Sequence, residues 1–293
     1  MRRPVEEFGL IDLVKAIVFG VVEGVTEWLP ISSTGHMLLL EQFVHLNATP
    51  EFWDMFLVVI QLGAIMAVVV LFFDRLNPFT KRKTAFERRS IVNLWGKIIL
   101  ACIPAAVIGI PLDDWMEEHL GHPLIIAAAL IVYGIAFIAI ENSRAHGARA
   151  AVLRDAAAPV QKIDDMPWTT ALGIGAFQVL SLVPGTSRSG STIIGGLLLG
   201  CSRTVAAEFT FYMAIPVMFG ASALRLVKFF LEGGSMGFGG ATTLLVGGLV
   251  AFVVSIIVIR FLLDYVRQHD FKPFGWYRIA LGVAVIAWYF LLA

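Results

Sequence analysis

The chain has 293 residues, of which 58% are hydrophobic and 15% are charged, and its formal net charge is zero. Soluble domains carry about 25% charged residues, and one soluble core of this size cannot bury such an apolar surplus. The composition excludes a disordered, collagen-like or disulfide-stapled chain and gives no indication of nucleic-acid binding. It predicts an all-α integral membrane protein with a single membrane domain over residues 1–293.

The predicted elements begin with an apolar stretch at 10–45, which a segment rich in Pro, Ser, Thr and Gly interrupts at 30–36. A second apolar stretch, at 167–200, is interrupted in the same way at 184–190. Irregular backbone at membrane depth is tolerated only where protein or a wet cavity covers it. We interpret both stretches as re-entrant helix–loop–helix hairpins.

Six other stretches approach the ~20 residues that a helix needs to cross the hydrocarbon. They lie at about 54–73, 96–112, 122–140, 208–228, 239–263 and 274–292. Lys and Arg gather in the loops after the first, third and fifth of these spans, whereas the predicted loops at 113–121 and 229–238 contain neither. The positive-inside rule therefore places the basic loops in the cytoplasm and both termini on the outer side.

A weak internal repeat relates the two hairpins, because Pro30 and Ser33 in the first correspond to Pro184 and Ser187 in the second. We predict a first repeat at about 10–112 and a second at about 167–263, with opposite topology because the hairpins enter from opposite sides. In inverted repeats the broken helices meet near the midplane and form the usual binding site.

Glu23 and Glu27 are the first polar residues that stand out, since ionisable side chains at membrane depth are costly and normally functional. They are four residues apart and so share one helix face. Two carboxylates this close resist joint ionisation unless a cation or a proton relieves them. The pair predicts either a divalent metal site or a carboxylate pair that shares a proton.

Each interrupting segment resembles a loop that opens onto a helix, where free amides and the helix dipole favour an anion. Arg188 adds a planar fork that suits phosphate oxygens, and it can at the same time form an ion pair with Glu23 or Glu27. The predicted ligand is a phosphate or diphosphate on a lipid-soluble tail. The phosphate-binding residues predicted from the two segments are Ser32, Thr34, Gly35, Ser187, Ser189 and Thr192.

Two further polar residues, Gln61 and Glu208, either line the same cavity or form hydrogen bonds across helices. Glu208 also belongs to the repeat, because Glu51 and Glu208 are each followed by Phe and, twelve residues later, by Gly-Ala.

At these residues the sequence resembles the bacterial undecaprenyl-diphosphatase family, also called bacitracin-resistance proteins. The resemblance rests on EGVTEWLPISSTGH at 23–36 and PGTSRSGST at 184–192, with support from VIQLG at 59–63 and AEFTF at 207–211. It covers nearly the whole chain, and the first two segments together are highly specific. The departures are the N-terminal extension and the linker at 142–166.

The resemblance implies a phosphatase that converts undecaprenyl diphosphate to the monophosphate and so recycles the lipid carrier of cell-wall synthesis. It also implies a bacterial plasma-membrane location, a site that faces the outer side, and a need for Mg²⁺ or Ca²⁺. The site residues carried over from the family are Glu23, Glu27, Ser33, His36, Ser187, Arg188 and Thr192. We expect the substrate and membrane lipids as partners, with a possible homodimer.

The chemistry of these residue types then suggests roles. Glu23 and Glu27 hold the cation, and Arg188 neutralises the phosphoryl group that is transferred. The nucleophile is Ser33, His36 or an activated water, with a preference for Ser33 and for His36 as its base or acid. A secondary transporter or flippase of a lipid phosphate or anion is the alternative, since inverted repeats with a charged midplane site also fit alternating access.

Overall fold

The computed structural model describes residues 9–80, 82–144 and 155–291, apart from some side chains within them. In this part of the chain the secondary structure is helical, with one isolated bridge between Val160 and Cys201. The helices are α1 (Leu10–Thr26), α2 (Ser33–Glu41), α3 (Pro50–Leu71), α4 (Phe73–Leu76), α5 (Ala85–Leu120), α6 (Pro123–Arg144), α8 (Trp168–Gln178), α9 (Arg188–Leu198), α10 (Arg203–Leu231), α11 (Phe238–Val266) and α12 (Lys272–Leu291), with 3-10 turns η1 (Ile163–Asp165) and η2 (Val179–Leu182).

Six of the helices, α3, α5, α6, α10, α11 and α12, are long and apolar enough to cross a membrane. This confirms the all-α membrane class and the six predicted spans. The predicted bounds differ most at α5, which begins at Ala85 because Thr84 and Glu87 form a capping box there. The predicted loop at 113–121 is also wrong, since α5 continues as a helix to Leu120.

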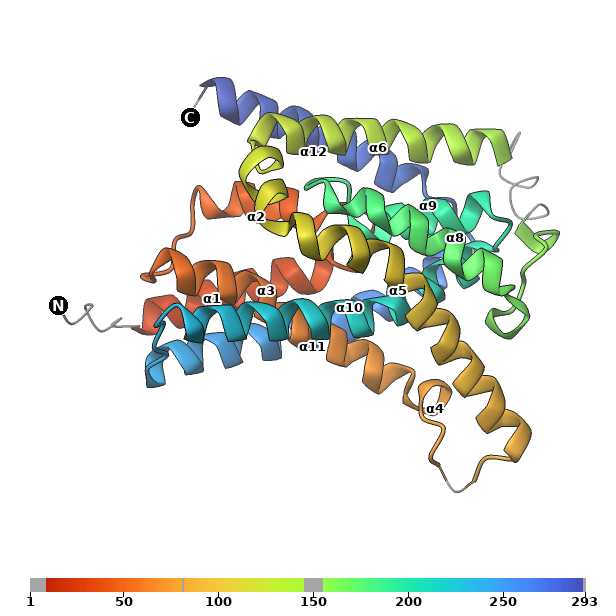
Figure 1. The fold of residues 1–293 in the computed structure, drawn as a ribbon. Coiled ribbons are helices and arrows are strands. Elements are labelled where there is room, and N and C mark those ends of the chain that lie inside the picture. The colour runs from red at the N-terminus through yellow and green to blue at the C-terminus, as the bar shows by residue number, and fades with distance from the viewer. Residues whose placement is uncertain (1–8, 81, 145–154, 292–293) are drawn as a thin grey trace.

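The long helices pack in pairs around the two short hairpins (Figure 1). α6 lies along α12, α1 and α3 both lie along α11, and α3 also packs against α10. α11 turns one side outward, where Leu245, Leu249, Val253 and Ile257 are exposed at four-residue spacing. That spacing places the four side chains on one face of the helix, where lipid can cover them.

The hairpins α1–α2 and α8–α9 begin at opposite ends of the molecule, and their turns meet in its interior (Figure 1). The start of α1 and the end of α12 lie at one end of the molecule, and the opposite end carries α4 and the start of α5 (Figure 1). The re-entrant placement of these hairpins in a membrane and the inverted repeat at 10–112 and 167–263 stay predictions.

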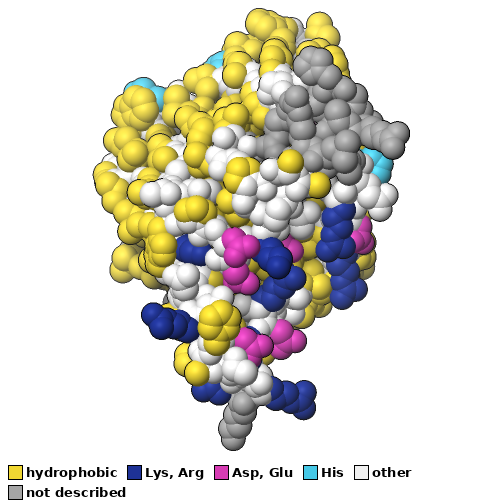
Figure 2. Space-filling model, turned by 90° about the vertical axis from the view of Figure 1, so that its right-hand side faces the viewer, with side chains coloured by type: hydrophobic (Ala, Val, Ile, Leu, Met, Phe, Trp, Pro, Cys, Tyr) yellow, Lys and Arg dark blue, Asp and Glu magenta, His cyan; other side chains and the backbone are white. Residues whose placement is uncertain are grey.

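The end that carries α4 is also where charged side chains gather. Figure 2 shows Lys, Arg, Asp and Glu together on this face, beside hydrophobic side chains. The loop between α4 and α5, the segment before α8 and the turn between α11 and α12 all lie here (Figure 1). The loops after the first, third and fifth spans, which carry most of the Lys and Arg, therefore lie at the same end of the molecule. Lys81, Arg149 and Arg154 of these loops lie outside the described residues.

Candidate active site

The two hairpin turns have the same local conformation. Ser32 and Ser187 have φ angles of 72° and 70°, and in the described chain they are the non-glycine residues with positive φ. Each caps the helix that follows, since Ser32 Oγ accepts from the Gly35 amide at 3.4 Å and Ser187 Oγ accepts from the Gly190 amide at 3.2 Å. Non-glycine residues rarely adopt this conformation, so both turns hold backbone strain of a kind found at functional sites.

Glu27 lies at the centre of the site and joins four elements. Its Oε1 accepts from Arg188 Nη2 at 3.0 Å, and its Oε2 accepts from Ser33 Oγ at 2.9 Å. Arg188 Nη1 donates in turn to the Thr210 carbonyl of α10 at 3.0 Å. The side chains of Glu27 and Arg188 are only 9% and 12% exposed. The ion pair that the sequence allowed is therefore present, and it involves Glu27.

Ser189 and Thr192, two of the predicted phosphate-binding residues, are fully engaged by the protein. Ser189 Oγ donates to the carbonyls of Glu27 and Leu29, at 3.2 and 3.3 Å. Thr192 Oγ1 donates to the Arg188 carbonyl at 2.9 Å and accepts from Thr210 Oγ1 at 2.8 Å. Both residues are buried. In this structure they join the second hairpin to the first hairpin and to α10.

A cavity of about 160 Å³ borders the Glu27–Arg188 pair. Ser33, Thr34 and Ser187 line it together with the two members of the pair. Gln61 of α3 lines the same cavity, as one of its two predicted positions requires. The remaining walls include Val217, Met218 and Ala221 of α10, so the chamber is polar around the ion pair and apolar farther along α10.

His36 does not reach this cluster. Its Nδ1 lies 2.7 Å from the Ser32 carbonyl oxygen, and its Nε2 lies 2.8 Å from the Tyr277 hydroxyl on α12. Both ring nitrogens are therefore occupied away from Ser33. In this structure the hydrogen-bond partner of Ser33 is Glu27, and the role of His36 as base or acid for Ser33 stays a prediction.

Glu23 is almost completely buried one turn before Glu27, and its Oε1 has no hydrogen-bond partner within the described part of the chain. No group of three or more His, Cys, Asp or Glu side chains that could hold a metal occurs among the described residues. An unpartnered carboxylate oxygen beside a second carboxylate still suits Mg²⁺, which commonly uses one or two carboxylates and takes its other ligands from substrate phosphates and water.

Arg278 of α12 is a site residue that the sequence analysis missed. Its side chain is completely buried, and Nη2 donates to the carbonyls of Gly185 and Thr186, both at 2.8 Å. Nη1 donates to the Pro30 carbonyl at 3.2 Å. One guanidinium thus holds both hairpin turns. A single cation inside the apolar stretch predicted at 274–292 is the signal that could have identified it.

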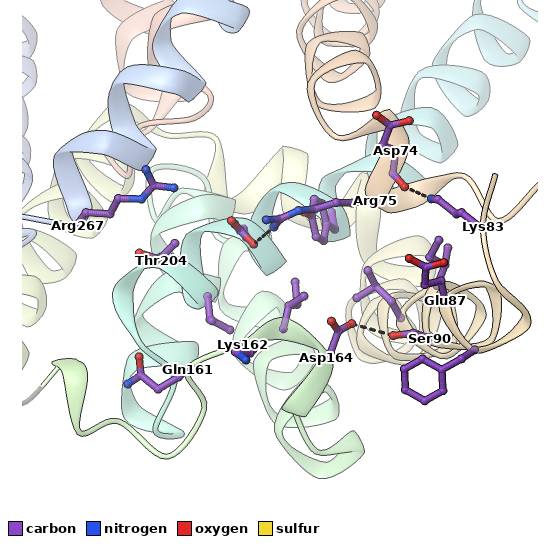
Figure 3. Close-up of a pocket in the computed structure, with 17 residues that line it drawn as sticks. Asp74, Arg75, Lys83, Glu87, Ser90, Gln161, Lys162, Asp164, Thr204 and Arg267 are labelled. Atoms are coloured by element: carbon purple, nitrogen blue, oxygen red, sulfur yellow. Dashed lines mark hydrogen bonds and ion pairs between the residues drawn. The ribbon is translucent and has the colours of Figure 1, made fainter. Parts of the chain in front are cut away.

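Glu208 lies in a different cavity. Its Oε2 accepts from Arg75 Nη1 at 2.9 Å, in a space of about 610 Å³ at the α4 end of the molecule. Figure 3 shows Arg75 and Arg267 projecting towards this space, with Asp164 bonded to Ser90 on the opposite wall. Of the two predicted positions for Glu208, the hydrogen bond across helices is the one observed.

The fold and the site together define an integral membrane protein that joins a buried carboxylate, a serine hydroxyl and a guanidinium between two helical hairpins. Comparison with known proteins narrows this class. Residues 16–284 match the family described as Bacitracin resistance protein BacA, and the chain belongs to that family.

Similar proteins that carry the name undecaprenyl-diphosphatase come from several bacteria. The undecaprenyl-diphosphatase of Lactiplantibacillus plantarum is 54% identical over 283 residues, which are 97% of this chain and 100% of that protein. The undecaprenyl-diphosphatase of Limosilactobacillus fermentum is 53% identical over 284 residues, again 97% and 100% of the two chains. The undecaprenyl-diphosphatase of Streptococcus pyogenes serotype M3 is 53% identical over 281 residues, or 96% and 98%.

Proposed function

We propose that this protein hydrolyses undecaprenyl diphosphate to undecaprenyl phosphate and inorganic phosphate. The observation that carries the proposal is the Glu27 carboxylate, which binds a serine hydroxyl with one oxygen and a guanidinium with the other, beside a cavity inside a membrane bundle. The names of relatives that match almost the whole chain support the substrate. The product is the lipid carrier of cell-wall synthesis, and the family description, Bacitracin resistance protein BacA, supports a role in resistance to bacitracin.

The contacts of Ser33 support its role as the nucleophile. Glu27 Oε2 takes the proton from Ser33 Oγ. The Ser33 Oγ then forms a bond to the terminal phosphorus of the diphosphate. The bond from this phosphorus to the bridging oxygen breaks, and the lipid monophosphate leaves with the electron pair and the proton held by Glu27. Water then attacks the phosphoserine, its proton passes through Glu27 to Ser33 Oγ, and inorganic phosphate is released.

Charge neutralisation is the task of Arg188 and of the two helix N-termini. Arg188 and Ser33 bond to the two oxygens of the same carboxylate, Glu27, so the guanidinium is close to Ser33. It can therefore bind the oxygens of the phosphoryl group that is transferred. The first amides of α2 and α9 carry partial positive charge in the same region. Glu23 and Glu27 would hold a Mg²⁺ or Ca²⁺ ion, which supplies Lewis-acid neutralisation of the diphosphate when bound.

The direction of the cavity supports access from the outer side of the plasma membrane. Arg188 donates to the Thr210 carbonyl, while the apolar wall of the cavity is formed by Val217, Met218 and Ala221, farther along α10 and away from the basic end. The positive-inside rule assigns the basic end to the cytoplasm. The isoprenoid tail stays in the bilayer, so membrane lipids border the site. The homodimer stays a prediction.

Phosphate release from purified protein in detergent tests the proposal. Wild-type protein with a long-chain isoprenyl diphosphate and Mg²⁺ should release phosphate, and a chelator should stop the release. Glu27→Gln, Ser33→Ala and Arg188→Ala should each lower kcat by about 10²-fold or more, because each removes a proton acceptor, a nucleophile or a charge partner. Thr242→Ala is the control and should keep wild-type activity, because Thr242 lies near the start of α11 and its hydroxyl donates within its own helix, to the Phe238 carbonyl.

Two outcomes would contradict the proposal. A wild-type protein that releases no phosphate with any divalent cation would favour the transporter, which needs a sealed membrane and a gradient. Full activity in Ser33→Ala would leave the phosphatase intact but would remove Ser33 as the nucleophile and favour an activated water.

A further inference from the structure

Tyr277 of α12 contacts the His36 ring. The two rings stack with an angle of 7° between their planes and 5.5 Å between their centres, and the hydroxyl lies 2.8 Å from Nε2. Tyr277 precedes Arg278, whose guanidinium holds the carbonyls of both hairpin turns. Two consecutive residues of α12 therefore reach the catalytic turns, one directly and one through an imidazole.

The hydrogen bonds of His36 fix the form of its ring. A carbonyl oxygen can only accept, so Nδ1 carries a proton and donates to the Ser32 carbonyl at 2.7 Å. In the neutral ring Nε2 is then the acceptor, and the Tyr277 hydroxyl donates to it. Neither nitrogen offers a free electron pair to a phosphorus atom in the cavity that Glu27 and Ser33 line.

The hydrogen bond from His36 stabilises the strained backbone conformation of Ser32. Its φ of 72° is strained for a serine, and the strain persists only where surrounding contacts hold it. The corresponding turn at Ser187 lies next to the Gly185 and Thr186 carbonyls, which Arg278 holds. At the first turn Arg278 reaches only the Pro30 carbonyl, and the Ser32 carbonyl is held by His36.

The Ser32 carbonyl carbon is bonded to the Ser33 nitrogen, so the orientation of that peptide sets the position from which Ser33 Oγ reaches Glu27. We propose that Tyr277 is a positioning residue, which holds the His36 ring so that its Nδ1–H fixes the Ser32–Ser33 peptide beneath the nucleophile. The inference rests on the proposed phosphatase activity and on Ser33 as its nucleophile. It gives His36 a positioning role in place of a nucleophilic or acid–base role.

Paired substitutions at His36 test this inference by rescue. In His36→Asn the amide nitrogen occupies the place of Nδ1 and can still donate to the Ser32 carbonyl, whereas in His36→Gln the amide lies one bond farther out. His36→Asn should therefore keep kcat within about 10-fold of wild type, and His36→Gln should lose about 100-fold, the effect of an ~1 Å displacement of a reacting group. KM should stay within about twofold in both, because His36 does not line the cavity.

Tyr277→Phe keeps the stacked ring and removes the hydroxyl, so kcat should fall by about 3-fold to 10-fold at unchanged KM. Tyr289→Phe is the matched control, because Tyr289 lies on the same helix as Tyr277 but away from the site. Its hydroxyl lies 3.4 Å from His122 Nε2. It should keep wild-type kcat. Thermal unfolding of each variant in detergent shows whether it is folded. If Tyr277→Phe does not fold, the two His36 variants carry the test.

A trapping experiment separates the failure of this inference from the failure of the proposed function. After a rapid quench of turnover with substrate labelled in the terminal phosphate, the label should be acid-stable, as expected of phosphoserine, and absent from Ser33→Ala. Acid-labile label that disappears in both His36 variants would overturn the positioning role and leave the phosphatase standing. Equal kcat in His36→Asn and His36→Gln would overturn it as well. A wild-type protein without phosphate release would instead remove the proposed function itself.

Discussion

Arg278 carries its charge in the interior and is bonded to backbone carbonyls. Its guanidinium donates to Gly185, Thr186 and Pro30, and Nε lies 3.5 Å from the Leu130 carbonyl. The Tyr133 ring lies 5.4 Å away and offers its π face. A planar fork with donors in fixed directions can serve several carbonyls at once, which a lysine ammonium cannot do. The residue therefore works as a rigid connector between the turns.

Arg278→Lys tests this role, because it keeps the charge and removes the fork. Some of the carbonyls lose their donor, and we expect the free energy of unfolding to fall by about 2 kcal/mol or more. Arg267→Lys is the control, since Arg267 pairs with Asp264 on an exposed surface and its replacement should change stability by less than about 0.5 kcal/mol. Thermal unfolding in detergent measures both, and equal midpoints would contradict the connector role.

At the scale of elements, α3 and α11 approach each other through a glycine. A methyl group on Gly63 would overlap the backbone of Gly248, whereas a methyl group on Gly248 would point into open space. Small residues allow such close approach between helices in membranes, where van der Waals contact drives association. α3 also carries Gln61, so the position of this helix affects one wall of the cavity.

Gly63→Ala and Gly248→Ala should therefore have different effects on stability, although both residues lie where α3 meets α11. Gly63→Ala forces the helices apart and should lower stability by about 1–3 kcal/mol, the usual cost of overpacking. Gly248→Ala adds a better helix former without a clash and should be neutral or raise stability by up to about 1 kcal/mol. Unfolding midpoints of the two variants check the prediction, and equal losses would contradict it.

The sequence predicted the elements better than the orientation of the side chains between them. Apolar length is a local property, so the six spans could be predicted, as could the turn at Ser32–Ser33 from its helix-opening residues. The partners of His36 and Arg278 depend on which face α12 turns towards α2 and the hairpin turns, and no local pattern encodes that contact. Arg188 could be assigned a carboxylate partner because few buried charges exist, although the choice of Glu27 needed the structure.

The whole molecule is electrically asymmetric. The basic loops lie at one end, and the first and last described residues lie at the other (Figure 1). The apolar wall of the candidate cavity is formed by residues of α10 that lie farther from the basic end than Thr210 does. The positive-inside rule gives this asymmetry a direction in the cell. The enzyme should therefore work on lipid that arrives from the outer leaflet.

Cysteine labelling tests the direction. In a variant that lacks Cys102 and Cys201, single cysteines at Glu232, beyond α10, and at Arg88, early in α5, should differ in intact cells. Glu232→Cys should react with a membrane-impermeant thiol reagent, and Arg88→Cys should react only after the cells are opened. Both side chains are exposed, so burial does not protect either of them. The reverse pattern would place the active site on the cytoplasmic side.

Two cavities border α10, and a single residue, Phe209, separates Glu208, which lines the one at the basic end, from Thr210, whose carbonyl binds Arg188 at the edge of the other. If both cavities fill with water, the short part of α10 between them is the main barrier to ions. Most of the transmembrane voltage then falls across this part of the protein. A displaced elementary charge corresponds to about 2.3 kcal/mol per 100 mV. If the diphosphate enters from the outside, as proposed, it stays on one side of that drop, and we expect its hydrolysis to be independent of the voltage.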